Sequence, residues 1–416
     1  MGFPSPNAAS ASSSLPIGSS MWVSKGMEPL ITCSDGSVWL RSGLAVAPRQ
    51  FPEAAKLRHL QLFGAPCTSG PGFSTTPVSI ATDGAGNFIA VSPGTNNVYV
   101  STDGGDTWTA YAANLPTGNP CSCAYGNGNW VLVGCGTSSI TTSYRSGSPA
   151  GAFTAGSTVA TTSTASDSAK VVYAGGTNFF IAANGTNTAC GALSSNSGVS
   201  FTAKSLSAAI NAGSTMPQIA SDGAGKLMIV ARLNTGDFIN YSTDYGVTWA
   251  SAAYSGTSLS GCIGAAYFNS QMWFLVSSGS TGKLAYSTNG GSLSGTVAIP
   301  MGNFSYVSAI LSAGVLCVIA GKLTFPLTNG NSLMSGAWQY DGTNFTTCQF
   351  SASLTFNGSH GGFCGDSSGR FVAVSSGSAY SGYGNLTSPS AIGSPSEALI
   401  ANNSAVYANL YYKVKE

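Results

Sequence analysis

Short apolar runs recur along this chain at a nearly constant interval. Each run is rich in β-branched and aromatic residues and is bounded by turn formers, which is typical of a buried strand and too short for a helix. The runs are Phe88–Val91, Trp130–Val133, Phe179–Ile181, Leu227–Val230, Trp273–Val276, Leu316–Ile319 and Phe371–Val374. Their starts are 42, 49, 48, 46, 43 and 55 residues apart. The pattern therefore predicts a strand-rich unit that is repeated seven times.

A second short strand, made of small residues, is expected just before several of these runs. Examples are Val78–Ala81, Cys121–Ala124, Gln218–Ser221 and Cys262–Ala265. Small side chains suit the innermost strands of sheets that crowd around an axis. A period of roughly 40–50 residues matches the four-stranded blades of a β-propeller. We expect an all-β fold, a β-propeller of seven four-stranded antiparallel blades, with eight or six blades as alternatives because the ends of the chain are ambiguous.

A turn motif with the pattern Ser-x-Asp-x-Gly-x-Thr-Trp supports the repeat. Its Asp can accept hydrogen bonds from backbone N–H groups two or three residues on, and its Gly supplies a positive φ. We therefore expect Asp103 and Asp244 to be structural. The motif residues are Ser101, Asp103, Gly105 and Trp108, then Ser242, Asp244, Gly246 and Trp249, and in a weaker copy Ser194, Asn196, Gly198 and Phe201. A partial copy lies at 287–291, and a decayed copy is expected near 143–147.

The motif resembles the Asp-box (BNR repeat) of sialidase-like β-propellers. The resemblance covers the turns and the fold but not the active site. Sialidases use an arginine cluster, a Tyr activated by Glu and an Asp acid, whereas the Arg residues of this chain match no such motif. Its four Glu, at positions 28, 53, 397 and 416, lie outside the repeats.

The ends of the chain predict two regions. Residues 1–26 are small and polar with several prolines, so we expect an extended arm or attachment segment there. Residues 27–416 are expected to form one propeller. Leu30–Leu40 and Val406–Val414 resemble strands, and pairing of N- and C-terminal strands in one blade would close the ring and remove exposed edges.

The composition of the chain narrows the classes of function that we expect. Charged residues make up 7% of the chain and the net charge is +1, against roughly 25% charged residues in typical soluble proteins. We therefore expect neither nucleic-acid binding nor membrane insertion. The first 20 residues lack the features of a secretory signal. Ten Cys without a Cys-x-x-Cys pattern are expected to be buried free thiols, although their redox state stays open. We expect no cofactor and no metal, since His59 and His360 lie far apart in sequence.

Candidate chemistry is sparse. After the turn residues are set aside, Asp106, Asp167, Asp237 and Asp341 are weak catalytic candidates. The inventory favours a non-enzymatic protein and leaves an enzyme open. A propeller holds many loops on a rigid ring, which suits binding. Aromatic side chains stack on sugar faces, and the candidate ligand contacts are Tyr245, Tyr380 and Tyr383.

The segment Leu15–Trp22 resembles the short attachment segments of bacteriophage tail fibres. With the low charge and a surface of Ser, Thr, Asn and Gly, this favours a virion appendage made in the host cytoplasm. Its arm would dock on other virion proteins, and its propeller would bind a host glycan, a receptor or another virion protein. The alternatives are a sialidase-like hydrolase with a drifted site and an assembly scaffold. The ligand, the face that binds it and the oligomeric state, a homo-oligomer included, stay open.

Overall fold

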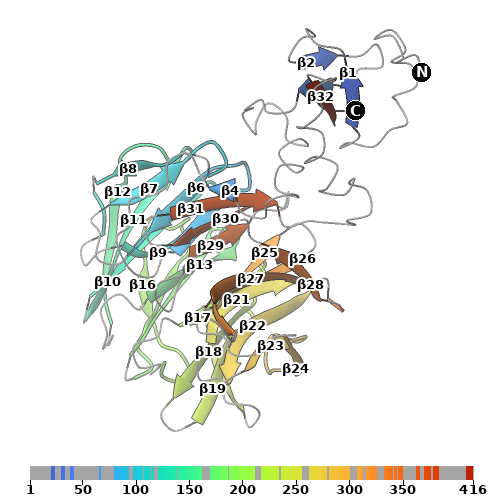
Figure 1. The fold of residues 1–416 in the computed structure, drawn as a ribbon. Helices are drawn as coiled ribbons and strands as arrows, with labels where there is room; N and C mark the ends of the chain where they lie inside the picture. Colours follow the sequence, from blue (N-terminus) through green and yellow to red (C-terminus); the bar gives the residue numbers. More distant parts are fainter. Residues whose placement is uncertain are drawn as a thin grey trace. The chain divides into compact units, whose positions relative to one another are not determined.

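The structure is a computed structural model of the whole chain. It describes residues 20–23, 30–32, 38–41, 65–66, 79–92, 97–105, 107–112, 114–116, 120–136, 138–161, 169–185, 187–210, 217–233, 236–254, 262–278, 281–299, 307–312, 315–325, 332–340, 342–343, 345–349, 362–365, 370–375, 378–383 and 409–415. The chain divides into two compact units: unit 1 is residues 1–65 with 386–416, and unit 2 is residues 66–385. Every regular element of the described residues is a strand (Figure 1).

The repeats of unit 2 form a series of four-stranded sheets, which we call blades 1 to 7 in chain order. Blade 1 contains β5 (Ser79–Thr82), β6 (Phe88–Val91), β7 (Val98–Ser101) and β8 (Thr109–Tyr111), and blade 2 contains β9 (Pro120–Gly126), β10 (Asn129–Cys135), β11 (Ser139–Ser146) and β12 (Thr154–Ala160). Blade 3 contains β13 (Ala169–Gly175), β14 (Asn178–Ala183), β15 (Gly191–Ser194) and β16 (Thr202–Lys204). Blade 4 contains β17 (Gln218–Ser221), β18 (Leu227–Leu233), β19 (Gly236–Ser242) and β20 (Ala250–Tyr254).

The remaining blades follow the same order. Blade 5 contains β21 (Cys262–Phe268), β22 (Gln271–Ser278), β23 (Thr281–Ser287) and β24 (Gly295–Ala298), and blade 6 contains β25 (Val307–Ser312), β26 (Val315–Phe325), β27 (Ser332–Tyr340) and β28 (Phe345–Gln349). Blade 7 contains β29 (Gly362–Gly365), β30 (Arg370–Ser375) and β31 (Ser378–Tyr383), with β4 (Ala65–Pro66) as its fourth strand. The seven apolar runs of the sequence are therefore the second strands of the seven blades.

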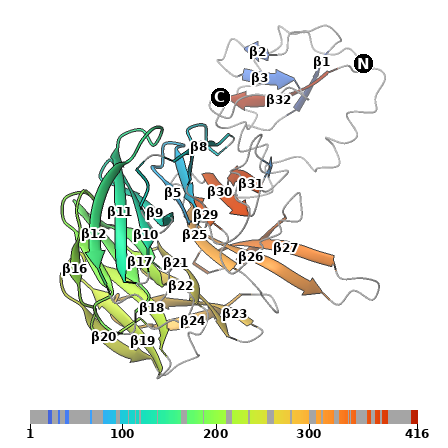
Figure 2. The same cartoon turned by 90° about the vertical axis from the view of Figure 1, so that its left-hand side faces the viewer.

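The first strands of the blades meet around a common axis. Each of β5, β9, β13, β17, β21 and β25 contacts the first strand of the next blade, and β29 contacts β5. Figure 2 shows several of these strands side by side at the centre of the blades. The ring is closed by this contact, so the prediction of an all-β propeller with seven four-stranded antiparallel blades is confirmed.

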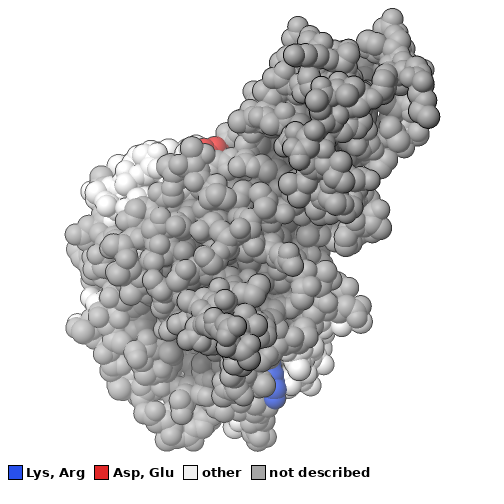
Figure 3. Space-filling model, viewed as in Figure 1, with Lys and Arg blue, Asp and Glu red and all other residues white. Residues whose placement is uncertain are grey.

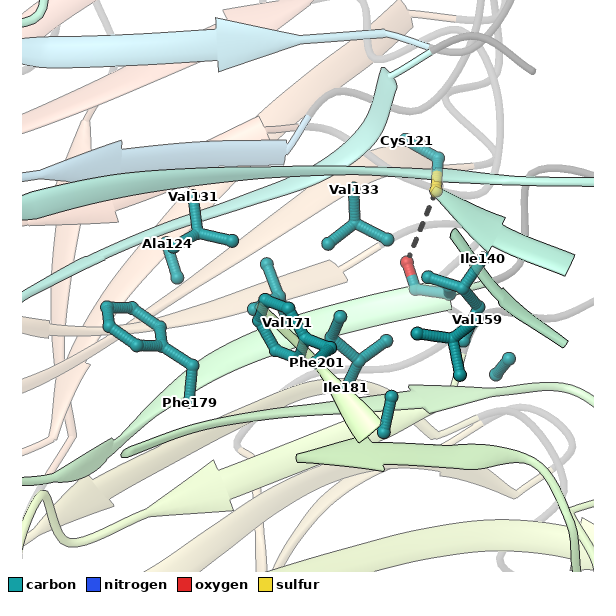
Figure 4. Packing of buried hydrophobic residues seen from close by; sticks show 13 residues of the cluster. Cys121, Ala124, Val131, Val133, Ile140, Val159, Val171, Phe179, Ile181 and Phe201 are labelled. Carbon is teal, nitrogen blue, oxygen red and sulfur yellow. Dashed lines mark hydrogen bonds between the residues drawn. The ribbon is translucent and has the colours of Figure 1, made fainter. Parts of the chain in front are cut away.

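The core of unit 2 lies between neighbouring blades. Val131 and Val133 of β10 face Phe179 and Ile181 of β14 across the gap between blades 2 and 3 (Figure 4). All four side chains are fully buried. Because the second strand is covered on both faces, it is apolar at nearly every position, which explains why it was readable from sequence.

The first strands need small residues for a related reason. The thiol of Cys121 in β9 lies 3.5 Å from the carbonyl oxygen of Ala169 in β13 (Figure 4). The backbone N–H of Val171 donates to the hydroxyl of Ser122, 3.1 Å away. Small side chains therefore let neighbouring first strands approach closely and bond to one another.

Unit 1 contains a separate sheet with the strand order β1-β32-β3-β2. Its strands are β1 (Ser20–Val23), β2 (Leu30–Thr32), β3 (Val38–Arg41) and β32 (Asn409–Lys415). The N- and C-terminal strands therefore pair, with Trp22 opposite Leu410.

This division differs from the expected boundaries of 1–26 and 27–416. Part of the expected arm forms β1, and the paired terminal strands lie in unit 1. The fourth strand of blade 7 is instead supplied by β4. A strand of two residues shows no periodicity in the sequence, so the longer terminal strands were expected to close the ring instead. None of the described segments forms a helix that is long and apolar enough to cross a membrane.

Candidate functional site

The turn between the third and fourth strands of blade 4 contains a dense hydrogen-bond network. The hydroxyl of Ser242 donates to Asp244 Oδ1 at 2.8 Å and accepts from the N–H of Gly246 at 2.9 Å. The carboxylate of Asp244 accepts from the N–H of Thr248 at 2.9 Å and from its hydroxyl at 2.6 Å. The indole N–H of Trp249 donates to the carbonyl of Gly246 at 3.0 Å. These bonds all lie within the turn.

The turn of blade 1 repeats this arrangement. Ser101 donates to Asp103 at 2.7 Å, and Asp103 accepts from the N–H and hydroxyl of Thr107 at 3.0 and 2.5 Å. The indole N–H of Trp108 donates to Gly105 at 3.0 Å. The same residue types at the same spacing therefore produce the same bonds in two blades.

Asparagine replaces the aspartate in blade 3. Asn196 Oδ1 accepts from the N–H of Ser200 at 3.0 Å, while its amide Nδ2 donates to the Ser200 hydroxyl at 2.8 Å. Ser194 donates to Asn196 at 2.9 Å and accepts from Gly198 at 2.9 Å. Phe201 is buried in place of the Trp. A neutral amide thus makes the same turn, because it can accept at one atom and donate at the other.

The partial copy in blade 5 retains the polar bonds of the turn and lacks the indole bond. Asn289 Oδ1 accepts from the backbone N–H groups of Gly291 at 2.9 Å and Ser292 at 3.1 Å. Ser287 accepts from the N–H of Gly290 at 2.9 Å. The turn therefore persists without the aromatic residue.

Blade 2 has an arginine where the decayed copy was expected. The N–H of Gly147 donates to the carbonyl of Gly128 at 2.9 Å, as the N–H of Gly104 does to Gly86 in blade 1 at the same distance. The guanidinium of Arg145 donates to the carbonyls of Ser148, Ala150 and Ala152. A cation that donates to carbonyls thus closes this loop in place of an anion that accepts from N–H groups. Sequence reasoning located the turn but missed this role of Arg145.

In blades 1 to 4 a backbone hydrogen bond joins the third-to-fourth turn to the first-to-second turn of the same blade. Ser197 donates its N–H to Thr177 at 2.7 Å in blade 3, and Tyr245 donates to Gly225 at 2.9 Å in blade 4. The residue that donates its N–H to the first-to-second turn has a positive φ, which is +83° at Gly104, +59° at Ser197 and +64° at Tyr245. Tyr245 is therefore a bulky aromatic residue in a backbone conformation that favours glycine.

The carboxylates of these turns are engaged by backbone groups. Asp83 Oδ1 accepts from Ala85 at 2.8 Å, and Asp222 Oδ1 accepts from Ala224 at 2.8 Å and from Lys226 at 2.9 Å. Slight burial pushes the pKa of Asp244 upward, but the hydrogen bonds from Thr248, Ser242 and Val247 outweigh it and lower that pKa. These aspartates, like Asp103, therefore orient loops of the ring.

Only some of the candidate ligand-binding and catalytic residues from the sequence lie in the described part of the chain. Among the aromatic candidates, Tyr245 lies in the blade 4 turn, where 38% of its surface is exposed. Tyr380 and Tyr383 lie on β31, and only their backbone is described. Asp237 lies on β19, also as backbone alone. The candidates outside the described residues are Asp106, Asp167, Asp341, His59 and His360.

Metal-binding and thiol chemistry can be checked only in the described part of the chain. There, no group of three or more His, Cys, Asp or Glu residues could hold a metal ion. Cys121, Cys123 and Cys190 are buried free thiols, and Cys364 is a half-buried one. Burial raises the pKa of Cys123 to about 12, against an opposing hydrogen bond from Ser79, and that of Cys190 to about 11. The prediction of free thiols is confirmed at these four positions.

Charged and large apolar side chains are both rare on the described surface. On the face drawn in Figure 3, charged atoms are sparse among the described residues. The exposed large hydrophobic residues of the described part are Val199, Tyr245 and Val247, and they lie in the blade 3 and blade 4 turns. The blade 4 turn, which holds Tyr245 and Val247, is the best-defined candidate site.

Comparisons with known proteins support the fold. A structure of YCF48 bound to D1 peptide superposes with a TM-score of 0.52 at 12% identity, over 77% of this chain and 95% of that chain. Hydrazine synthase from Kuenenia stuttgartiensis gives 0.52 at 8% identity, over 77% and 98%. YCF48 from Cyanidioschyzon merolae gives 0.46 at 13%, over 77% and 99%. No protein-family model and no curated protein matches the chain. Identities this low show the β-propeller fold alone.

Proposed function

We propose that this chain is a non-enzymatic binding propeller. The observation that carries the proposal is the placement of Tyr245, an exposed aromatic residue held in a fixed turn of a closed ring. A rigid scaffold that presents loop residues is suited to recognition. The engagement of the Asp103 and Asp244 carboxylates within their own turns supports a role for them in shaping the loops.

The setting that we propose is a virion appendage, with the propeller binding a host surface glycan. The support comes from the 7% charged residues and from the segment Leu15–Trp22, which resembles tail-fibre attachment segments. A neutral surface of hydroxyl and amide groups suits a neutral glycan, because such groups can donate and accept hydrogen bonds without a fixed charge.

Two measurements test this function. Mass spectrometry of purified virions should detect the chain, and the purified full chain should bind a glycan array or whole cells of candidate hosts. Detection in particles together with saturable binding supports the proposal. Absence from particles, or no binding to any glycan or cell surface, would contradict it.

A protein-binding scaffold is the second candidate function. The observation in its favour is the fold shared with YCF48, which was solved bound to D1 peptide. It predicts that affinity capture with the full chain retains one cellular protein in stoichiometric amount, and that the chain is absent from virions.

A further inference from the structure

The ring of Tyr245 is supported on one side by a glycine of the neighbouring turn. A Cβ atom placed on Gly225 would lie 3.2, 3.2 and 3.3 Å from Cε1, Cζ and Cε2 of this ring. Three nearly equal distances put Gly225 over the face of the ring, since an approach along the edge would meet the atoms at unequal distances. One face of the ring therefore rests on Gly225, which is itself buried, while 38% of the tyrosine stays exposed.

The tyrosine is kept at this position despite a conformational cost. Its φ is +64°, and the corresponding turn positions hold small residues, Gly104 in blade 1, Gly147 in blade 2, Ser197 in blade 3 and Gly290 in blade 5, all with positive φ. A left-handed conformation is unfavourable for a residue with a large side chain. Glycine would make the turn without this cost, so the turn itself does not explain the aromatic ring.

Two opposite charges flank the supporting glycine in sequence. Asp222 is half-buried three residues before Gly225, and Lys226 is exposed directly after it. Asp222 is oriented by its bonds to the N–H groups of Ala224 and Lys226. Lys226 Cδ lies 3.9 Å from a Cβ atom placed on Gly290, so its side chain extends toward the blade 5 turn, and Asp222 is the charged group fixed within the turn that supports the ring.

The size of the apolar surface indicates the kind of ligand. A stable protein interface buries about 800 Å² on each partner, around an apolar centre. Val199, Tyr245 and Val247 are the exposed large apolar residues of the described part, and each is exposed by less than half. A single sugar ring needs one aromatic face and a few hydrogen-bonding groups.

We propose that the exposed face of Tyr245 stacks on the apolar C–H face of a neutral pyranose. The Asp222 carboxylate, in the turn that contains Gly225, accepts hydrogen bonds from sugar hydroxyls. This inference rests on the proposed glycan-binding function and adds the location and the ligand class. It places the site at the end of the ring where the first-to-second and third-to-fourth turns lie.

The test uses the full chain and neutral oligosaccharides of glucose, galactose, mannose and rhamnose, with affinities from calorimetric titration. Tyr245→Gly removes the ring and relieves the backbone, so it should lower the affinity at least about tenfold while the protein stays folded. Tyr245→Phe keeps the ring and should bind within about threefold of the unmodified chain. Val199→Ser changes the neighbouring turn and should leave sugar affinity unchanged.

The outcomes separate this inference from the function on which it rests. Full sugar affinity in Tyr245→Gly overturns the location and leaves glycan binding in place. A wild-type chain that binds only charged glycans overturns the ligand class. If the wild-type chain binds no glycan, the inference and the glycan function are overturned together. Capture of a protein by the wild-type chain, lost in both Tyr245→Gly and Val199→Ser, would then support the scaffold function.

Discussion

The carboxylate of Asp244 accepts two hydrogen bonds from Thr248, one from its backbone N–H at 2.9 Å and one from its hydroxyl at 2.6 Å. Asp103 and Thr107 are related in the same way in blade 1. The pair ties the start of the turn to its end. The indole of the following Trp249 then packs against Phe180 of blade 3, with ring centroids 4.7 Å apart. A local turn bond therefore also positions a contact between blades.

The first prediction concerns this carboxylate. Asp244→Ala removes the acceptor for Thr248 and Ser242, and we expect it to lower the free energy of unfolding by about 1–2 kcal/mol in urea titration. Asp244→Asn should cost less, because Asn196 makes the same turn in blade 3. Unchanged stability in Asp244→Ala, with loss of ligand binding, would contradict a structural role.

The second prediction follows from the lowered pKa of Asp244. A carboxyl group whose pKa is lower in the folded state than in the unfolded state stabilises the fold above its unfolded pKa of about 3.9. That contribution is lost as the pH falls through the lower, folded value. The stability difference between the wild type and Asp244→Asn should therefore be constant above about pH 5 and should shrink below about pH 4. A difference that grows on acidification would refute this.

The third prediction tests a close approach between blades. Gly246 has a φ of +88°, and a Cβ atom there would lie 2.5 Å from Cδ2 of Phe180. Gly246→Ala should therefore destabilise the protein by about 2–4 kcal/mol, from backbone strain and overpacking. Gly223→Ala is the matched control, because its φ is +67° and no atom lies within 4 Å. It should cost about 1 kcal/mol in the same urea titration, and equal losses would show that the contact with Phe180 is unimportant.

The fourth prediction concerns the arginine of blade 2. Arg145→Met keeps much of the apolar stem and removes the three bonds to the 148–152 loop. Hydrogen exchange measured by mass spectrometry should be faster in this loop and unchanged in blade 4. Arg145→Lys should be intermediate, because one ammonium cannot reproduce the planar guanidinium fork. Unchanged exchange in Arg145→Met would show that these three bonds do not hold the loop in place.

The fifth prediction concerns the thiols. A thiolate is the reactive form, and burial holds the pKa of Cys123 at about 12 and that of Cys190 at about 11. At pH 8 both should resist iodoacetamide in the folded protein and react in urea, as read by peptide mass spectrometry. Half-buried Cys364 should react before the buried Cys121, Cys123 and Cys190. Rapid labelling of Cys123 in the folded state would contradict its burial.

Much of the ring could be predicted from sequence because burial on both faces leaves a strong signal. The run Leu227–Val230 lies within β18, and the expected inner strand Gln218–Ser221 coincides with β17. The position of the turns was also readable, because few residue types can adopt their backbone conformations. Blade number, however, depended on the ends of the chain.

The features that were missed depend on contacts between residues distant in sequence. β4 has two residues and is defined by its place beside β31, more than 300 positions away. In blade 2 Arg145 closes the loop through bonds to three carbonyl groups, which no motif would match. Tyr245 was found as an exposed turn aromatic, but its support by Gly225 joins two separate turns and required coordinates.

The outer strand of blade 7 has a consequence for the order of assembly. During synthesis, β4 leaves the ribosome before any blade of the ring, whereas β29 to β31 emerge after the other six. Blades 1 to 6 can each form from contiguous chain, but the seventh joins segments made at opposite times. A nascent or truncated chain that ends before residue 362 therefore lacks three strands of the seventh blade, and the circular fold becomes complete only after β31 has been synthesised.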